Sequence, residues 1–219
     1  MIKIENTDVY GFEASIRGMR SPMNSWDKSD SGYKPVIFPP CNDTRIEFVI
    51  GENDLKLMKS LAKAGSDHGK FLRMINVTMD VTAPLYWWKE ADTYRVGKEQ
   101  NSCSTMHKIH AKKFTLDDFS HEHLRYNYLA FMEKMIIMLN DARVQYLHAE
   151  KLDEKSFWWQ MIQLLPSSYN QRRTVQLNYE VLRNMYHARK NHKLDEWRDF
   201  CAWCETLPYF KEICLGDSE

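Results

Sequence analysis

Hydrophobic and polar residues alternate over residues 71–81, which gives the clearest strand signal in the chain. One side of the alternation is apolar and the other polar, with Ile75, Val77, Met79 and Val81 facing Asn76, Thr78 and Asp80. A period of two predicts a strand with one buried face. Pro84 lacks the amide hydrogen that a ladder needs but suits the first turn of a helix. We therefore predict a helix over residues 85–96, ended by Gly97.

The segment before this strand divides into an apolar and a polar part. Residues 1–19 place isolated apolar side chains among polar neighbours, so we expect them to be extended and to pair in the same sheet. Residues 20–40 are rich in Ser, Asp, Gly and Pro, which are typical of turns and loops. We expect a ligand or a neighbouring subunit to order this loop.

A second strand and a helix are predicted between the loop and the central strand. Residues 46–50 have the composition of a short strand, and residues 55–64 have an apolar face typical of a helix. Asn53 or Asp54 can cap that helix, and Gly65 can end it.

The longest helix is predicted after Thr115, which begins a capping box completed by Asp118. Apolar residues then recur at steps of three and four: Leu124, Tyr128, Phe131, Met135, Met138, Ala142 and Tyr146. This face belongs in the core or in a subunit interface. A shorter helix is predicted over residues 153–164.

Composition narrows the class of protein. The 219 residues suffice for one substantial core, and we expect a single α/β (α+β) domain over residues 1–219, with a mainly antiparallel sheet packed by long helices. Lys plus Arg and Asp plus Glu both number 30, so we expect neither a nucleic-acid nor a membrane partner. No apolar run approaches the roughly 18 residues of a membrane span.

Five scattered cysteines do not form a disulfide framework, and no charged-then-apolar leader precedes them, so a cytoplasmic location is expected. Cys201 and Cys204 form a lone CxxC that favours packing over zinc, and we expect no metal. The segment around Cys103 can be read as a nucleophile or as a polar loop.

Basic residues gather between residues 172 and 198. Arg183, His187 and Lys190 share a helical neighbourhood by spacing. Arg172, Arg189 and Arg198 are expected at helix ends or on adjoining turns, where guanidinium groups can bind phosphate. The alternative is a solvated basic face that is neutralised by Glu180, Asp195 and Glu196.

The stretch from His68 through Ala83-Pro84 to a Ser/Asn-rich loop resembles the flavin-dependent thymidylate synthases. In that family the helix ends in Arg-His-Arg, and these positions correspond to Thr93, Tyr94 and Arg95. Asn101 and Ser104 fall on the asparagine and serine of the family's loop. A second block matches from Leu165, where Arg172, Asn178, Leu182 and Arg189 meet the family's positions, and Glu196, Trp197 and Arg198 fall on Glu-Ile-Arg.

The resemblance implies that the protein makes dTMP from dUMP, with methylenetetrahydrofolate as carbon donor and NADPH reducing FAD. It assigns Ser104, Arg172 and Arg198 to the pyrimidine nucleotide. It assigns His68, Arg95, His187 and Arg189 to the flavin, and Arg95 and Ser104 to catalysis. The family builds its sites between subunits, so a homotetramer is expected too.

Several positions depart from the family pattern: Glu90 replaces glutamine, Thr93 and Tyr94 replace Arg-His, Ser102 replaces glutamate and Met106 replaces arginine. They favour a divergent or phage-like member. Two further hypotheses stay open: a non-catalytic or altered-specificity homologue that binds nucleotide or flavin, and an interaction protein that kept the scaffold.

Overall fold

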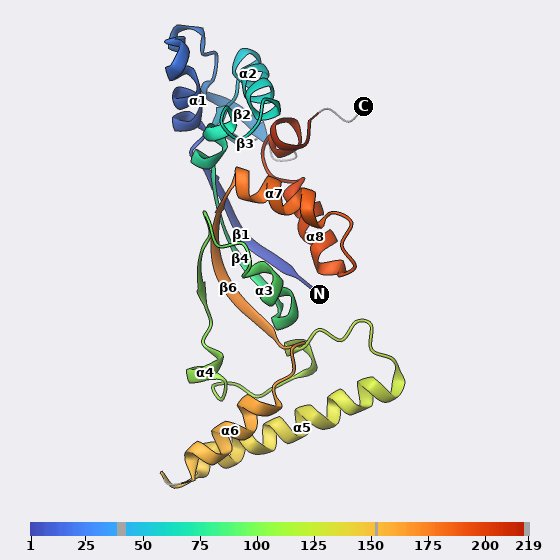
Figure 1. The fold of residues 1–219 in the computed structure, drawn as a ribbon. Helices are drawn as coiled ribbons and strands as arrows, with labels where there is room; N and C mark the ends of the chain where they lie inside the picture. The colour runs from blue at the N-terminus through green and yellow to red at the C-terminus, as the bar shows by residue number, and fades with distance from the viewer. Residues whose placement is uncertain (39–42, 152, 217–219) are drawn as a thin grey trace.

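The computed structural model describes residues 1–38, 43–151 and 153–216. A four-stranded sheet forms the middle of the molecule (Figure 1). In spatial order its strands are β1 (Lys3–Tyr10), β4 (Asn76–Pro84), β6 (Asn170–Asn178) and β5 (Glu99–Ser102). All neighbouring pairs are antiparallel. The predicted α/β class, with a mainly antiparallel sheet packed by helices, is confirmed.

The register of β4 and β6 sorts their side chains onto two faces. Val77 lies opposite Leu177 and Met79 opposite Val175, so the buried residues of both strands share one face. Helices α3 (Leu85–Ala91), α7 (Tyr179–Arg189) and α8 (Asp195–Cys204) pack over it, and we call it the covered face (Figure 1). The other face, here the open face, carries half-buried or exposed polar residues: Asn76, Thr78, Asp80, Thr82, Arg172, Thr174 and Gln176.

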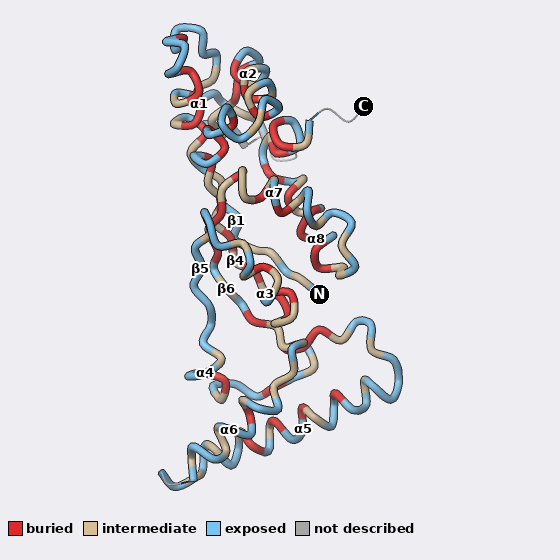
Figure 2. Tube along the Cα trace, viewed as in Figure 1, coloured by how far each residue is buried: buried red, intermediate tan, exposed pale blue. Residues whose placement is uncertain are grey.

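Aromatic side chains fill the space between the covered face and its helices. Trp87 and Trp88 of α3, Trp197 of α8 and Tyr179 of α7 are almost completely buried, as the red stretches of Figure 2 indicate. The ring centroids of Trp87 and Trp197 lie 4.7 Å apart. This aromatic packing fixes α3 and α8 relative to the sheet.

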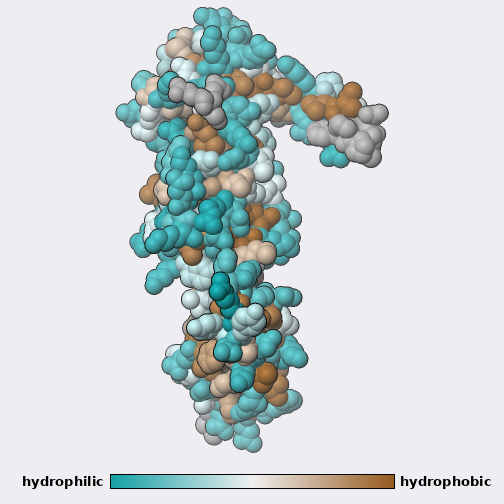
Figure 3. Space-filling view, turned by 90° about the vertical axis from the view of Figure 1, so that its right-hand side faces the viewer, coloured by the Kyte–Doolittle hydropathy of each residue, from teal (hydrophilic) through white to brown (hydrophobic). Residues whose placement is uncertain are grey.

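The upper end of the molecule in Figure 1 contains α1 (Phe12–Arg20) and α2 (Glu52–Lys63). Between them run the 3₁₀ turns η1 (Ser21–Met23) and η2 (Trp26–Lys28) and the hairpin of β2 (Gly32–Phe38) and β3 (Asp43–Val49). Figure 3 shows the hairpin projecting from the body as an arm with hydrophobic residues along it. A 3₁₀ segment η3 (Gly69–Met74) leads into β4, and a π-helical turn η5 (Lys211–Leu215) packs near α2.

The lower end is built around a second, smaller core. After α4 (Thr105–Lys108) and η4 (Leu116–Asp118), α5 (Tyr126–His148) and α6 (Glu154–Leu164) pack together. Met132, Leu139 and Met161 are buried there. Among the described residues, no helix is long and apolar enough to cross a membrane.

Several predicted boundaries were wrong for local reasons. Residues 12–20 are helical, not extended, because Gly11 turns the chain out of β1 at a φ of +98° and a Cβ there would lie 2.1 Å from the Met74 carbonyl oxygen. Phe12, Ile16 and Met19 then form a buried stripe with helical spacing. The segment 20–40, predicted as a loop, contains two 3₁₀ turns and the whole of β2; its residues 39 and 40 lie outside the described residues.

The helix ends also differ from the predictions. Gly51, and neither Asn53 nor Asp54, precedes α2, because Asp54 is buried as an acceptor inside the helix. Helix α3 ends at Ala91 instead of residue 96. The capping box at Thr115 is present but starts only η4, and the long helix begins at Tyr126.

Candidate functional site

Arg172 lies on the open face, near the start of β6, and not at a helix end or an adjoining turn as predicted. Its Nη2 donates to Asp80 Oδ2 at 2.7 Å. The same carboxylate accepts from Thr174 Oγ1 at 2.6 Å and from Asn6 Nδ2 at 2.8 Å. These hydrogen bonds, with that from Thr174 first, hold the pKa of Asp80 well below its usual range. The carboxylate therefore stays charged beside Arg172.

Arg173, the next residue of β6, points to the covered face. Its guanidinium lies 4.1 Å from the ring centroid of Trp88 and donates from Nη1 to both oxygens of Asp92, at 2.9 and 3.1 Å. Lys98 and Gln100 also donate to Asp92. Burial raises the pKa of Asp92, but the hydrogen bonds from Gln100 and Arg173 outweigh burial and lower it. These hydrogen bonds connect the end of α3 to β6 of the sheet.

A second arginine cluster joins α3, α7 and α8. Arg189, at the end of α7, donates to Glu90 Oε2 at 2.7 Å and to the Tyr94 hydroxyl at 3.0 Å. Its guanidinium carbon lies 4.8 Å from the ring centroid of Trp197. Trp197 Nε1 and His192 Nε2 lie 3.0 and 3.3 Å from the same Glu90 oxygen. The Glu90 carboxylate thus connects α3, which carries it, to α7 and α8.

Ser104 lies beside the strand that carries Arg172. The backbone amide of Cys103 donates to the Arg172 carbonyl at 3.0 Å, and Gln171 Nε2 donates to the Cys103 carbonyl at 2.9 Å. Ser104 itself caps α4 by accepting from the His107 amide at 3.1 Å. The structure therefore brings Ser104 near Arg172 through strand pairing, and Ser104 is exposed.

Arg198 binds the loop that follows the second cluster. Its Nη1 donates to the His192 carbonyl at 2.9 Å, and its Nη2 pairs with Asp195. Arg189 and Arg198 thus hold opposite ends of one loop, but each already has an acidic partner.

The remaining predicted residues do not join these clusters. His68 precedes η3 and is exposed. Arg95 is exposed in the turn after α3 and makes no ion pair within the described part of the chain. His187 lines a cavity of about 630 Å³ between α2, α7 and η5, together with Lys63, Arg183 and Glu212.

The clusters differ in what they can still bind. A guanidinium has five N–H donors. Arg172 uses only Nη2, so Nε and Nη1 have no hydrogen-bond partner among the described residues. An anion could accept from either nitrogen without displacing Asp80, but not from both at once, because Nε–H and Nη1–H point to opposite sides of the guanidinium. Arg189 uses Nε and Nη1 and keeps Nη2.

The cysteines near the C-terminus pack in the core. Burial raises the pKa of the Cys201 thiol to about 11 and that of Cys214 to about 12. Neutral, buried thiols are poor nucleophiles and poor metal ligands. Within the residues that the structure describes, no group of three His, Cys, Asp or Glu side chains could hold a metal ion.

Sequence reasoning missed Arg173, Asp92 and the role of Glu90 as an acceptor. For Arg173 a signal was present, since it shares the parity of Val175 and Leu177 in the alternation of β6. No sequence signal indicated the contact between Glu90 and Arg189, because 99 positions separate the two residues in the chain.

No protein-family model matches the sequence, and no curated protein matches it. Solved structures do match the fold. A crystal structure of thymidylate synthase X from Helicobacter pylori with FAD and dUMP superposes with a TM-score of 0.66 at 14% identity, covering 98% of this chain and 97% of that one. A second structure of the flavin-dependent enzyme from Helicobacter pylori, also with FAD and dUMP, gives a TM-score of 0.64 at 16% identity, covering 98% of both chains. At such identity the likeness establishes the fold alone.

Proposed function

We propose that this chain is a divergent flavin-dependent thymidylate synthase-like protein that binds FAD and a pyrimidine nucleotide and converts dUMP to dTMP. The observation that carries the proposal is the end-to-end likeness of its fold to enzymes crystallised with FAD and dUMP. The two sequence blocks that resemble the family support it independently. We further propose that residues 1–219 form one domain, as the full-length match suggests.

In this proposal Arg172 and Ser104 contact the nucleotide. Nε and Nη1 of Arg172 have no partner among the described residues, and the exposed Ser104 follows β5, the strand that pairs with β6; their chemistry suits a phosphate or a uracil oxygen. Arg198 could also contact the nucleotide, but its guanidinium would then interact with both the ligand and Asp195.

The residues proposed for the flavin fit an anionic cofactor in their donor chemistry. Arg95 is exposed and lacks an ion pair in the described part of the chain, and Arg189 keeps one nitrogen free. His68 and His187 are exposed donors. When bound, FAD would carry the hydride that NADPH supplies, and methylenetetrahydrofolate would supply the carbon.

Turnover tests the proposal. Purified full-length protein with FAD, NADPH, methylenetetrahydrofolate and dUMP is expected to form dTMP. Arg172→Gln should reduce kcat/KM by tenfold or more, because a charge-assisted contact contributes about 1.5–3 kcal/mol. Arg125→Gln, an exposed arginine before α5, is the matched control and should change nothing. Absence of dTMP under saturating cofactors would reject the enzymatic assignment.

A second function is favoured by the ion pairs: a non-catalytic or altered-specificity homologue that binds nucleotide or flavin. Arg172, Arg189 and Arg198 each pair with a carboxylate of this chain, which weakens their attraction for phosphate. In this case FAD or dUMP would bind, measured by calorimetry, without dTMP being formed. Binding of neither ligand would leave the interaction-protein hypothesis.

We also propose that the protein is a homotetramer. Helix α5 exposes large apolar side chains: Tyr128, Phe131, Ile137 and Met138 are each more than half exposed. Exposed apolar side chains that gather on one element mark interaction surfaces, and a second copy of the chain would cover those of α5. Light scattering on the purified protein should give four times the chain mass of 26.1 kDa. A mass of one chain would contradict the proposal.

A further inference from the structure

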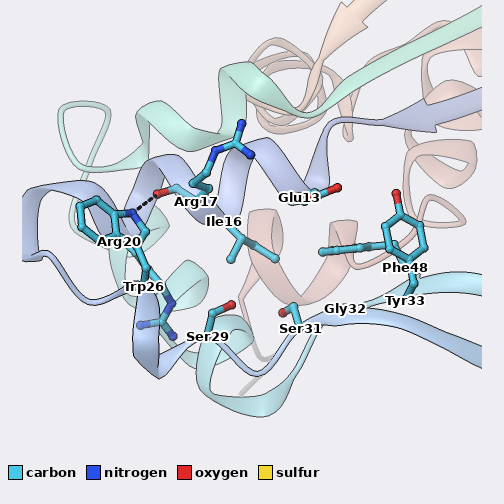
Figure 4. Close-up of a pocket in the computed structure, with 10 residues that line it drawn as sticks. All are labelled: Glu13, Ile16, Arg17, Arg20, Trp26, Ser29, Ser31, Gly32, Tyr33 and Phe48. Carbon is cyan, nitrogen blue, oxygen red and sulfur yellow. Dashed lines mark hydrogen bonds between the residues drawn. The ribbon is translucent and has the colours of Figure 1, made fainter.

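A cavity of about 400 Å³ lies between α1 and the base of the β2–β3 hairpin (Figure 4). Small-molecule sites usually measure about 300–1,000 Å³. The cavity is formed by α1, η2 and the hairpin, whereas the residues proposed above for nucleotide and flavin lie on other elements. It is therefore a separate place in the fold.

Aromatic rings stand at both ends of this cavity. Trp26 lies at one end, with half of its surface exposed, and its indole nitrogen donates to the Arg17 carbonyl at 3.3 Å. Tyr33 and Phe48 lie at the other end in an edge-to-face pair, 5.3 Å between centroids. Ile16 points between them from α1 (Figure 4). Ring faces and an apolar side chain of this kind favour a planar aromatic ligand.

The polar part of the cavity wall, where the end of α1 meets the segment that follows η2, is held by hydrogen bonds and an ion pair. Arg20 and Asp54 form a buried ion pair at 2.6 Å. Asp54 also accepts from the hydroxyls of Ser29 at 2.7 Å and Ser31 at 2.6 Å. These hydrogen bonds, together with the ion pair, lower the pKa of Asp54 against the opposing effect of burial. The cavity wall is thus preformed, which reduces the entropy lost on binding.

Two charged residues of α1 line the cavity and remain available. Arg17 and Glu13 are exposed and make no ion pair within the described residues. Arg17 contrasts with Arg20, whose charge Asp54 already neutralises. Arg17 suits an anionic group of a ligand, and Glu13 and the Ser29 oxygen suit its N–H or O–H donors.

We propose that this cavity binds a planar heteroaromatic molecule that carries an anionic group and hydrogen-bond donors, of the nucleoside monophosphate class. The heteroaromatic ring stacks on Trp26, at the end of the cavity beside Arg17. Arg17 pairs with the anion. This inference does not rest on the proposed enzymatic function.

Calorimetric titration of the full chain with AMP and with adenosine tests the proposal. AMP should bind about tenfold or more tightly than adenosine, since only AMP offers an anion to Arg17. In Arg17→Gln the two ligands should bind equally. Trp26→Leu should weaken both about tenfold or more through lost stacking.

Matched controls locate the effect. Arg125→Gln and Trp159→Leu change exposed residues of the same types far along the chain, and Arg172→Gln changes the proposed nucleotide contact. All three should leave the AMP affinity unchanged. AMP binding that is lost in Arg172→Gln but kept in Arg17→Gln and Trp26→Leu would overturn the proposal, as would no AMP binding to the native protein. Circular dichroism checks that each variant is folded.

Discussion

Two consecutive arginines of β6 face opposite sides of the sheet and have different surroundings. Arg172 on the open face pairs with Asp80 at the surface, and about half of its side chain is exposed. Arg173 on the covered face pairs with Asp92 and lies over Trp88, with 11% of its side chain exposed. The same residue type thus forms a surface ion pair on one face, where we propose that it contacts a nucleotide, and a mostly buried ion pair on the other. Strand parity, more than residue type, decides which role an arginine takes.

Removing Arg173 should give the largest effect of this comparison. Arg173→Ala leaves Asp92 with fewer donors and exposes Trp88, so we expect a loss of about 2–4 kcal/mol in the free energy of unfolding. Urea denaturation measures it. Arg173→Lys keeps the charge without the planar fork and should recover only part of the loss. A loss below about 0.5 kcal/mol in Arg173→Ala would show that the covered-face pair is not structural.

Glu90→Gln tests whether the ion pair between Glu90 and Arg189 restrains ligand binding. Without the carboxylate, Arg189 loses its ionic partner but keeps the Tyr94 hydroxyl. If Arg189 serves an anionic ligand, the affinity for FAD or dUMP should rise about tenfold, which calorimetry can measure. Asp195→Asn tests Arg198 in the same manner. An unchanged or lower affinity in both variants would mean that these pairs do not restrain ligand binding.

The pH dependence of stability compares Asp80, the partner of Arg172, with Asp92, the partner of Arg173. The pKa values of Asp80 and Asp92 are both below the ordinary 3.8, so each contributes stability above that pH, and the contribution is lost as pH falls through the lowered value. Asp80→Asn and Asp92→Asn should each make stability depend less steeply on pH below about 4. Urea denaturation at successive pH values measures the slope. Slopes equal to that of the native protein would contradict the pairing.

Arg172→Ala should have the smallest effect on stability. The pair is partly exposed, and Asp80 keeps Thr174 and Asn6, so we expect a clearly smaller loss in the free energy of unfolding than in Arg173→Ala. The same urea experiment as for Arg173→Ala gives the comparison directly. A loss as large as that in Arg173→Ala would erase the distinction between the two faces.

The sequence predicted the elements that have strong periodicity. The alternation around Val77 located β4, and the apolar repeat after residue 124 located α5. The failures came from backbone geometry and from contacts distant in sequence. Gly11 redirects the chain through a close approach to Met74, and no local pattern reports that approach.

The candidate site was only partly predictable. The resemblance selected Arg172 and Ser104, and the structure places Cys103, the neighbour of Ser104, beside Arg172, but the resemblance could not show that Asp80 pairs with Arg172. The apolar repeat of α5 was expected to be one buried or interfacial face. In the structure Met132, Ile136 and Leu139 are buried, while Phe131 and Met138 stay exposed, because α6 covers only one side of the helix.

The most direct test of the proposed function is the absorbance spectrum of the purified native protein, with and without added FAD. Bound flavin absorbs near ~450 nm, so a yellow protein, or one that takes up FAD and retains it on gel filtration, is the predicted result. A colourless protein that also fails to take up added FAD would contradict the proposal that this fold works as a flavoenzyme.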